Sequence, residues 1–488
     1  MKDLARLGVD LATELGAQYA DVRVVDRLVE EVTTKNGKVE ALSQNSSAGF
    51  GVRILMDGAW GFAGSALLER DEVERVAELA VRIARASARV PGEPVKLSPV
   101  EPVTDTWSSQ FKVDPFEVPL EDKISLLLDC DRAIRQRPEI RVAECEIQSY
   151  RYHKWFASSE GSEIEQSLTE CGAHLQATAV DGEEVQRRSY PSGLGGCHEA
   201  AGFEVVREDD LLAGAETISR EAIELLKAEQ CPPGELPIII DGSHMALQIH
   251  ESCGHPIELD RVFGTEASYA GTSFLTPEKY RNFRYGSDIV NLTADATIPG
   301  GLGTFGWDDE GVPSQRVPIV RSGQFVGYLT SRETAQQLRE IVGPSAPESS
   351  GGAMRADGWN RIPIIRMTNV SLEPGEWEFD DLIADTDDGI YMELNRSWSI
   401  DDKRLNFQFG TEIAYEIKNG KMGQMLKNAT YTGITPQFWG SCDAICNTNH
   451  WRVWGTPNCG KGQPGQTAHT GHGAAPARFR NIQIGVMK

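Results

Sequence analysis

The sequence predicts an α+β protein, with a mixed α/β region over residues 1–230 and a large, mainly antiparallel β domain over residues 231–488. Helical and strand patterns alternate through the first region. At Cys231 the run Cys-Pro-Pro-Gly-Glu cannot continue a helix, and beyond it glycine and aromatic residues increase while long helices become scarce. A hydrophobic fraction of 40% and a charged fraction of 25% indicate a globular protein with a substantial core.

The first region has the order helix, strands, helix twice, which is consistent with an internal duplication. Leucines 4, 7, 11 and 15 share one face of the first predicted helix, and Asp57-Gly58 predicts a hairpin turn. A Pro-rich linker is expected near 91–118. The predicted helices cover 4–15, 70–88, 120–135 and 209–226, and the predicted strands lie within 20–63 and at 141–149, 152–158, 162–166 and 174–180.

The C-terminal region shows short alternating segments separated by tight turns. Ser322-Gly323 and Asn419-Gly420 are turn signals of the kind that join antiparallel strands. The expected β domain carries one short helix, which follows the apolar run at 236–240 and bears the metal-binding residues described below.

Charge and hydropathy exclude several classes of function. Lys plus Arg number 48 and Asp plus Glu number 72, so the formal charge is −24 and a general nucleic-acid-binding role is disfavoured. No run approaches the ~20 apolar residues of a membrane-spanning helix. The N-terminus lacks the apolar core of a signal peptide, so a cytoplasmic location is expected, with its nine cysteines reduced.

A candidate metal motif reads His250-Glu251-Ser-Cys-Gly-His255. The zinc-peptidase motif H-E-x-x-H places its histidines one helical turn apart, but here there is one residue more. Five positions of a regular α-helix advance about 500°, so the two rings would diverge by roughly 140°. Gly254 tolerates almost any backbone conformation, and a residue before proline avoids the α region. We therefore expect the helix to end or bulge at Gly254, which would let His255 turn back toward His250.

Glu251 stands beside the first histidine, where zinc peptidases carry their general base. Zinc lowers the pKa of a bound water to about 7, and the glutamate takes up its proton. The competing interpretation is a capped helix end with two ordinary histidines.

A third protein ligand is needed to leave one position open for water. Cys459 lies in a glycine-rich loop, free to approach a metal, with Lys461 nearby to favour the thiolate. Cys253 is too close in sequence to bind together with both histidines, Cys442 and Cys446 read as structural, and His450 reads as a packed or surface residue. The full candidate set is Cys253, Cys442, Cys446, His450, Cys459, His469 and His472.

These residues and four further stretches resemble the TldD/PmbA family, in particular its metal-bearing TldD-like branch. The resemblance covers essentially the whole chain, with specific motifs from about residue 240 onward. The stretches are His250 to His255 with Glu258 and Asp260, Asp308-Asp309-Glu310-Gly311-Val-Pro, Pro363-Ile-Ile-Arg366-Met367-Thr368-Asn369, Gly389-Ile390-Tyr391, and Cys459-Gly460-Lys461-Gly462-Gln463.

The resemblance implies a zinc peptidase with one zinc per chain, held by His250, His255 and Cys459, and with Glu251 catalytic. It also implies a dimer that encloses a chamber, either a homodimer or a heterodimer with a PmbA/TldE-like paralogue, and substrates that are unfolded or extended peptides. A non-catalytic partner or modulator subunit of a protease complex is the alternative. The chain departs from the family pattern at Pro256 and in a longer segment over 343–360.

Two matched stretches have roles that the sequence leaves open. Asp308-Asp309-Glu310 is most simply a polar turn between strands, with a contact to a basic substrate or a dimer partner as the alternative. Arg366 could line the active site or pack against carboxylates.

Overall fold

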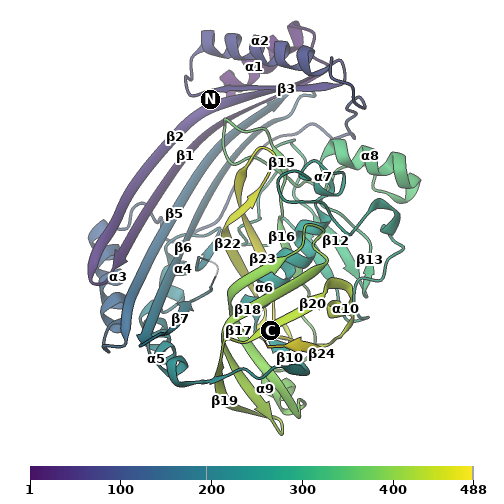
Figure 1. Cartoon of the computed structure of the whole chain (residues 1–488). Coiled ribbons are helices and arrows are strands. Elements are labelled where there is room, and N and C mark those ends of the chain that lie inside the picture. Colours follow the sequence, from purple (N-terminus) through teal and green to yellow (C-terminus); the bar gives the residue numbers. More distant parts are fainter. Residues whose placement is uncertain (194, 486–488) are drawn as a thin grey trace.

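A long, curved antiparallel sheet forms one side of the molecule (Figure 1) in this computed structural model, which describes residues 1–193 and 195–485. Its strand order is β3-β2-β1-β5-β6-β4, with β7 and β8 also paired to β6. The strands are β1 (Tyr19–Lys35), β2 (Lys38–Met56), β3 (Ala59–Ser65), β4 (Thr104–Ser108), β5 (Ile140–Ser158), β6 (Glu163–Asp181), β7 (Glu184–Tyr190) and β8 (Cys197–Glu199).

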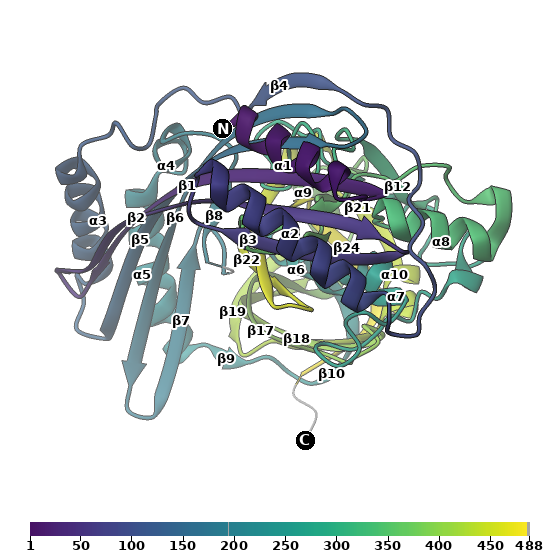
Figure 2. The same cartoon turned by 90° about the horizontal axis from the view of Figure 1, so that it is seen from above.

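Helices cover the two ends of this sheet. Figure 2 shows α1 and α2 side by side across one end, and α3 and α5 lie at the other. The predicted helices and the Asp57-Gly58 hairpin turn are confirmed, the turn with positive φ at both residues. The order α1-β1-β2-β3-α2 is followed, after β4, by the similar order α3-β5-β6-β7-β8-α4-α5, and β1 pairs with β5 between the two parts. These helices are α1 (Lys2–Glu14), α2 (Arg70–Ser87), α3 (Leu120–Ile134), α4 (Glu204–Glu208) and α5 (Leu211–Lys227).

The second copy differs from expectation in the length of its strands. Residues 141–149 and 152–158 were expected as two strands, but β5 runs without a break over Ile140–Ser158, and β6 likewise spans Glu163–Asp181. The hydrophobic alternation fades in the middle of β5, where Tyr152 and Lys154 turn toward the C-terminal half of the chain. Because that face meets protein through polar and aromatic contacts, an apolar period of two is not required there.

The C-terminal half contains two larger sheets with mostly antiparallel pairing. Their orders are β17-β10-β24-β20-β18-β19-β9, with β21 beside β24, and β13-β12-β11-β16-β23-β22. The strands are β9 (Glu229–Gln230), β10 (Gly234–Ile240), β11 (Leu292–Asp295), β12 (Arg316–Arg321), β13 (Gln324–Phe325), β14 (Met354–Arg355), β15 (Ile364–Ile365), β16 (Asn369–Leu372), β17 (Asp388–Ile400), β18 (Asn406–Lys418), β19 (Lys421–Lys427), β20 (Thr430–Ile434), β21 (Cys442–Ile445), β22 (Arg452–Lys461), β23 (Gln466–Ala474) and β24 (Ala477–Ile484).

Five short helices connect these strands, and the first of them carries the candidate metal motif. They are α6 (Gly242–Ile249), α7 (Leu259–Val262), α8 (Arg332–Val342), α9 (Phe379–Ala384) and α10 (Thr435–Gly440). Within residues 1–193 and 195–485, no helix has the length and apolar character that a membrane crossing requires.

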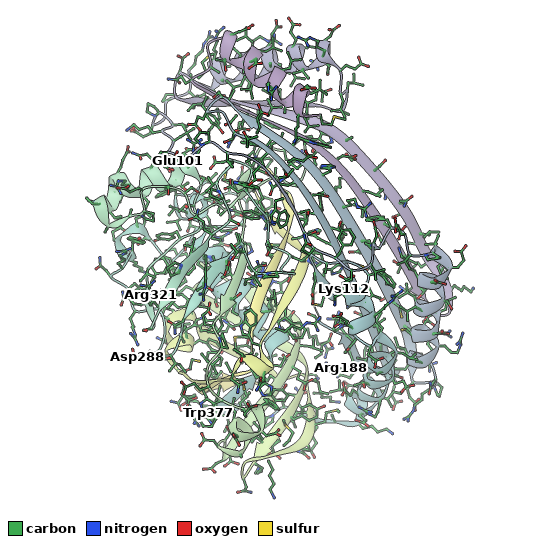
Figure 3. The ribbon with its side chains drawn as sticks, turned by 180° about the vertical axis from the view of Figure 1, so that it is seen from behind. Glu101, Lys112, Arg188, Asp288, Arg321 and Trp377 are labelled. Atoms are coloured by element: carbon green, nitrogen blue, oxygen red, sulfur yellow. The ribbon has the colours of Figure 1, made fainter. Side chains whose placement is uncertain are left out.

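Buried ion pairs join the long sheet to the C-terminal half. The carboxylate of Asp309 forms ion pairs with Nζ of Lys154 at 2.5 Å and with Nη1 of Arg23 at 3.2 Å. The carboxylate of Glu310 pairs with Nη1 of Arg53 at 3.2 Å. The expected polar turn at 308–310 is therefore a turn in which Asp309 and Glu310 are buried against cations of β1, β2 and β5 within the same chain, while Asp308 accepts backbone N–H groups. A second pair of this kind links Arg188 of β7, labelled in Figure 3, to Glu412 of β18.

Candidate metal centre

The helix that carries the motif starts from a well-made cap. Strand β10 ends at Ile240, and both carboxylate oxygens of Asp241 accept backbone N–H groups, from Ser243 at 2.9 Å and from His244 at 3.0 Å. The helix α6 is buried along its whole length, so its position is set by tertiary packing as well as by its cap. The site is therefore built on a rigid, buried element.

The backbone forms a π-helical turn over His250–Gly254, which accommodates the extra residue between the two histidines of the motif. The N–H of His255 donates to the carbonyl of His250, which is the i→i+5 bond of a π turn. Residues five apart are thereby brought onto one face, and the two imidazole centroids lie 4.8 Å apart. The expected bulge is present, but the helix does not end at Gly254, and a short 3₁₀ turn continues over His255–Ile257.

Two details of the expectation are wrong. Gly254 has helical dihedrals, so it is not needed for backbone freedom; instead a Cβ there would lie 2.3 Å from the sulfur of Met367. His255 precedes proline yet adopts φ −64° and ψ −41°. Pro256 removes the N–H that would bond the Ser252 carbonyl, and the hydroxyl of Tyr285 donates to that carbonyl at 2.8 Å.

His250, His255 and Cys459 converge, as the expected ligand set requires. Their potential ligand atoms all lie within 4.8 Å of one another, and all three residues are buried. The Sγ of Cys459 is 3.3 Å from Nε2 of His250 and 3.9 Å from Nε2 of His255. Tetrahedral zinc with bonds of about 2.0 Å to nitrogen and 2.3 Å to sulfur separates nitrogen from sulfur by about 3.6 Å. The observed separations bracket this value, so the residues fit a zinc ion.

The hydrogen bonds behind His250 direct its free nitrogen toward this point. Nδ1 of His472 lies 2.9 Å from the carbonyl of Val370, so it carries the proton and Nε2 of His472 is an acceptor. That acceptor is 2.8 Å from Nδ1 of His250, which must therefore be the donor. The lone pair of His250 is left on Nε2, facing Cys459 and His255.

Glu258 acts in the same way on His255. Its Oε2 accepts from Nδ1 of His255 at 2.9 Å, which leaves the lone pair on Nε2. The other oxygen of Glu258 is 3.4 Å from Nζ of Lys461, which also donates to Asp260 at 2.7 Å. From the sequence, His472 was a ligand candidate only, and Glu258 had no predicted role. The position of Glu258, three residues after His255, is compatible with a hydrogen bond to that imidazole.

The pKa values of the three groups favour metal binding. Burial lowers the pKa of His250 and of His255, so both imidazoles are neutral donors near neutral pH. Burial alone would raise the pKa of the Cys459 thiol, but the Arg366 guanidinium and His255 outweigh it, and that pKa lies below its usual value. Arg366 also donates to the carbonyl of Cys459. The cation that supports the thiolate is Arg366, whereas Lys461 is engaged by the carboxylates of Glu258 and Asp260.

We expect Glu258→Gln to weaken metal affinity by about 10–100-fold while keeping the ligand set, because an amide can present its NH₂ group to His255 and reverse the tautomer. Competition with a chromogenic chelator measures this change directly. Glu278→Gln, at an exposed glutamate remote in sequence from the motif, is the control that should leave the affinity unchanged. Equal affinity in the Glu258 variant and the wild type would remove Glu258 from this role.

Glu251 faces a cavity of about 450 Å³ that His250, His255 and Cys459 also line. Nη1 of Arg404 donates to Oε2 of Glu251. Arg404 lies between β17 and β18 with φ +61°, in the left-handed region that favours glycine. Arg404 was not identified as a site residue from the sequence. Its guanidinium holds the carboxylate of Glu251 in the wall of this cavity.

The remaining ligand candidates lie elsewhere. Cys253 is buried in the core beside Tyr285, and burial raises its pKa to about 12. Cys442 is buried in the same core cluster, Cys446 is buried in a separate cluster, and His450 pairs with Glu378 at 2.9 Å. His469 pairs with Glu170 at 2.5 Å on the other side of the β22–β23 hairpin. Among residues 1–193 and 195–485, the three predicted ligands form the one group suited to a metal ion.

Three family models together match most of the chain. The PmbA/TldA metallopeptidase domain 1 matches residues 20–84, the central domain matches 113–229, and the C-terminal domain matches 233–485. The last of these alone covers more than half of the 488 residues and contains every residue of the candidate site.

Relatives and solved structures are similar over nearly their full lengths. A metalloprotease of Methanocaldococcus jannaschii is 30% identical, over 96% of this chain and 97% of that protein. A zinc metalloprotease TldD homolog of Saccharolobus solfataricus is 22% identical, over 97% and 98% respectively. The crystal structure of TldE from Thermococcus kodakarensis has the same fold, with a TM-score of 0.72 at 17% identity over the whole of both chains.

Proposed function

Because the chain belongs to the PmbA/TldA metallopeptidase family, we propose that it hydrolyses peptide bonds with one zinc ion held by His250, His255 and Cys459. The observation that carries the proposal is the convergence of two imidazole Nε2 atoms and one thiolate beside a carboxylate in a cavity. Two nitrogens and one sulfur leave a fourth position for water, as catalytic zinc sites do.

The chain's own residues supply the proton transfers. A bound zinc ion polarises the peptide carbonyl and acidifies water. Glu251 accepts the proton of the attacking water and delivers it to the leaving amine. Arg404 keeps the carboxylate of Glu251 turned toward that water, and His472 and Glu258 keep both imidazole lone pairs turned toward the ion. The buried walls of the cavity, which include Leu247, limit competing solvent.

Strand β22 supports an extended substrate. It stands at the end of its sheet in the part of the chain that the structure describes, and it carries Cys459. An extended peptide that pairs with this edge would be held mainly through its backbone, which tolerates many sequences. The substrates are therefore unfolded or extended peptides.

The partner in solution is proposed from the relatives. A homodimer, or a heterodimer with a TldE-like paralogue, would enclose the active site in a chamber and exclude folded proteins. The rival function, a non-catalytic partner or modulator subunit, needs none of the converging residues His250, Glu251, His255 and Cys459.

Metal analysis tests the proposal. The purified protein should contain about one zinc per chain, and X-ray absorption at the zinc edge should show two nitrogen ligands, one sulfur and one light oxygen-type ligand. Removal of zinc by a chelator should abolish hydrolysis of an unfolded casein substrate, and zinc should restore it. A metal-free protein, or a shell that lacks sulfur, would contradict the assignment.

A further inference from the structure

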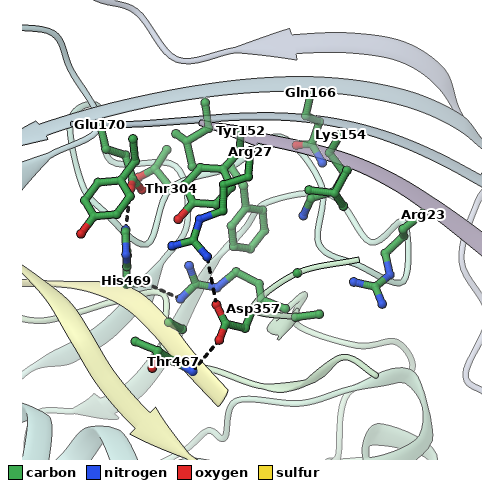
Figure 4. Close-up of a pocket in the computed structure, with 18 of the residues that line it drawn as sticks. Arg23, Arg27, Tyr152, Lys154, Gln166, Glu170, Thr304, Asp357, Thr467 and His469 are labelled. Carbon is green, nitrogen blue, oxygen red and sulfur yellow. Dashed lines mark hydrogen bonds and ion pairs between the residues drawn. The ribbon is translucent and has the colours of Figure 1, made fainter. Parts of the chain in front are cut away.

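A second cavity of about 330 Å³ lies on the other side of the β22–β23 hairpin from the metal cavity. Figure 4 shows it between the long sheet and the segment around Asp357, with β23 below. The hairpin separates the two cavities, because Asn458 and Cys459 line the metal cavity whereas Pro457, Thr467 and His469 line the second one. Ala468 is the direct cross-strand neighbour of Cys459.

The walls of this cavity combine aromatic rings with cations. The aromatic residues are Trp107, Tyr150, Tyr152, Phe305 and Trp307. The cations are Arg23, Arg27, Lys154 and Arg355. Such a concentration is notable in a chain whose formal charge is −24. The volume falls within the range of about 300–1,000 Å³ that is usual for ligand pockets.

Three carboxylates, those of Glu170, Asp309 and Asp357, lie near the four cations of the cavity, and Glu170 is engaged by His469. Arg23 and Lys154 share one carboxylate, that of Asp309. Arg27 is 3.7 Å from Asp357, beyond hydrogen-bond distance. Within the described ranges, 1–193 and 195–485, Arg355 has no carboxylate partner and donates to the carbonyls of Met367 and His469.

Unused hydrogen-bond donors are gathered at the same place. The Nε–H groups of Arg23, Arg27 and Arg355 are buried without an acceptor among the described residues. Arg23 is 1% exposed, so solvent does not satisfy it freely. The guanidinium of Arg27 lies over the ring of Tyr152 at 5.3 Å, and that of Arg355 over Phe305 at 5.9 Å. The rings occupy the guanidinium faces of Arg27 and Arg355, and the Nε–H groups remain for an anion.

We propose that this cavity is an auxiliary peptide-binding site that takes the carboxylate of an acidic residue and packs an adjoining aromatic side chain against its rings. The proposal rests on the peptidase function, because the one hairpin between the cavities allows a single extended peptide to reach both. Residues Arg355 to Gly358 of the wall belong to the segment 343–360, which is expected from the sequence to be longer than in the family that the chain resembles. The segment thereby sets a preference for acidic peptides.

Calorimetric binding of two matched probes tests the site without turnover. N-acetyl-Phe-Glu-amide and N-acetyl-Phe-Gln-amide are titrated into zinc-loaded protein that carries Glu251→Gln. We expect the Glu probe to bind at least about tenfold more tightly, because a charge-assisted hydrogen bond is worth at least that factor. Arg27→Gln should remove the difference, and Arg27→Lys should retain part of it. The half-exposed position of Arg27 makes a folded variant the expected result.

A second variant is expected to increase the affinity for the Glu probe. Asp357→Asn removes the carboxylate nearest to Arg27, so the Glu probe should bind more tightly than to the parent protein. Arg82→Gln, at an exposed arginine of α2, is the control for a general loss of charge and should change neither probe.

The metal cavity also contains arginines, and one comparison separates the two sites. If Arg396→Gln abolished the preference for the Glu probe and Arg27→Gln did not, the carboxylate would bind in the metal cavity and the proposal would be wrong. Equal binding of the two probes would also overturn it. Failure of the peptidase function would show instead as absent hydrolysis in the wild-type protein, with the binding difference intact.

Discussion

Glu251→Gln is expected to lower the hydrolysis rate by about 10²–10⁴-fold, which is the usual contribution of a general base. The amide keeps the size of the side chain, and its oxygen can still accept from Nη1 of Arg404. It cannot take a proton from water. Zinc content should stay near one per chain, because Glu251 is not a ligand in the proposed scheme. Peptide turnover, metal analysis and thermal unfolding of the same preparation check all three points.

Two further variants make this result specific. Glu333→Gln changes a partly buried glutamate, whose carboxylate accepts from Nε1 of Trp60 at 2.9 Å, and should leave turnover unchanged. Arg404→Gln removes the partner of Glu251 but keeps the base, so its loss of turnover should be smaller than that of Glu251→Gln. If Glu251→Gln kept full activity, the base would be another group; if it lost zinc, Glu251 would support the metal.

Cys459→Ser is expected to remove metal and activity together. A hydroxyl is a far weaker ligand for zinc than a thiolate, and it ionises only at much higher pH. Loss of a partner behind a ligand already costs about 10–100-fold in metal affinity, so loss of the ligand itself should cost more than about 100-fold. Zinc per chain should fall well below one after dialysis, and casein hydrolysis should fall in proportion to it.

Cys446→Ser is the matched control, since this cysteine is buried in a separate cluster with Ile239 and Leu382. It should keep its zinc and its activity. Excess zinc should partly restore the activity of Cys459→Ser, because the variant is limited by metal occupancy and keeps its base. A variant of Cys459 that held stoichiometric zinc would show that His250 and His255 bind with a different third group.

The contrast between the two variants separates catalysis from metal binding. Glu251→Gln should lose turnover with its zinc in place, whereas Cys459→Ser should lose turnover because its zinc is gone. A scaffold without catalytic function would show no activity in the wild type for either variant to reduce. The pair therefore also decides between the peptidase and a modulator subunit.

Secondary-structure elements that depend on local residue preferences could be predicted from the sequence alone. The periodicity of leucines 4, 7, 11 and 15 and the turn at Asp57-Gly58 act over a few residues, and the helix and the turn both appear in the structure. The buried face of α1 nevertheless carries Ala5, Gly8, Val9 and Ala12, while Leu15 lies just beyond the helix. The scarce histidines of the motif predicted two of the three residues that the structure brings together. The length of β5 could not be predicted, because the polar residues in its middle are covered by a region far away in the sequence.

The assembly of the site depends on contacts between residues that are far apart in the sequence. Cys459 is 209 residues from His250, and only the pairing of β22 with β23 beside α6 brings its sulfur within 3.3 Å of that imidazole. Two supporting groups likewise come from distant elements. The hydroxyl of Tyr285 donates to the free carbonyl of Ser252 in the π turn, and Nε2 of His472 accepts from His250 and fixes its tautomer. Local sequence encodes backbone preference, whereas the positions of distant side chains follow from sheet pairing and core packing, which no short stretch of sequence specifies.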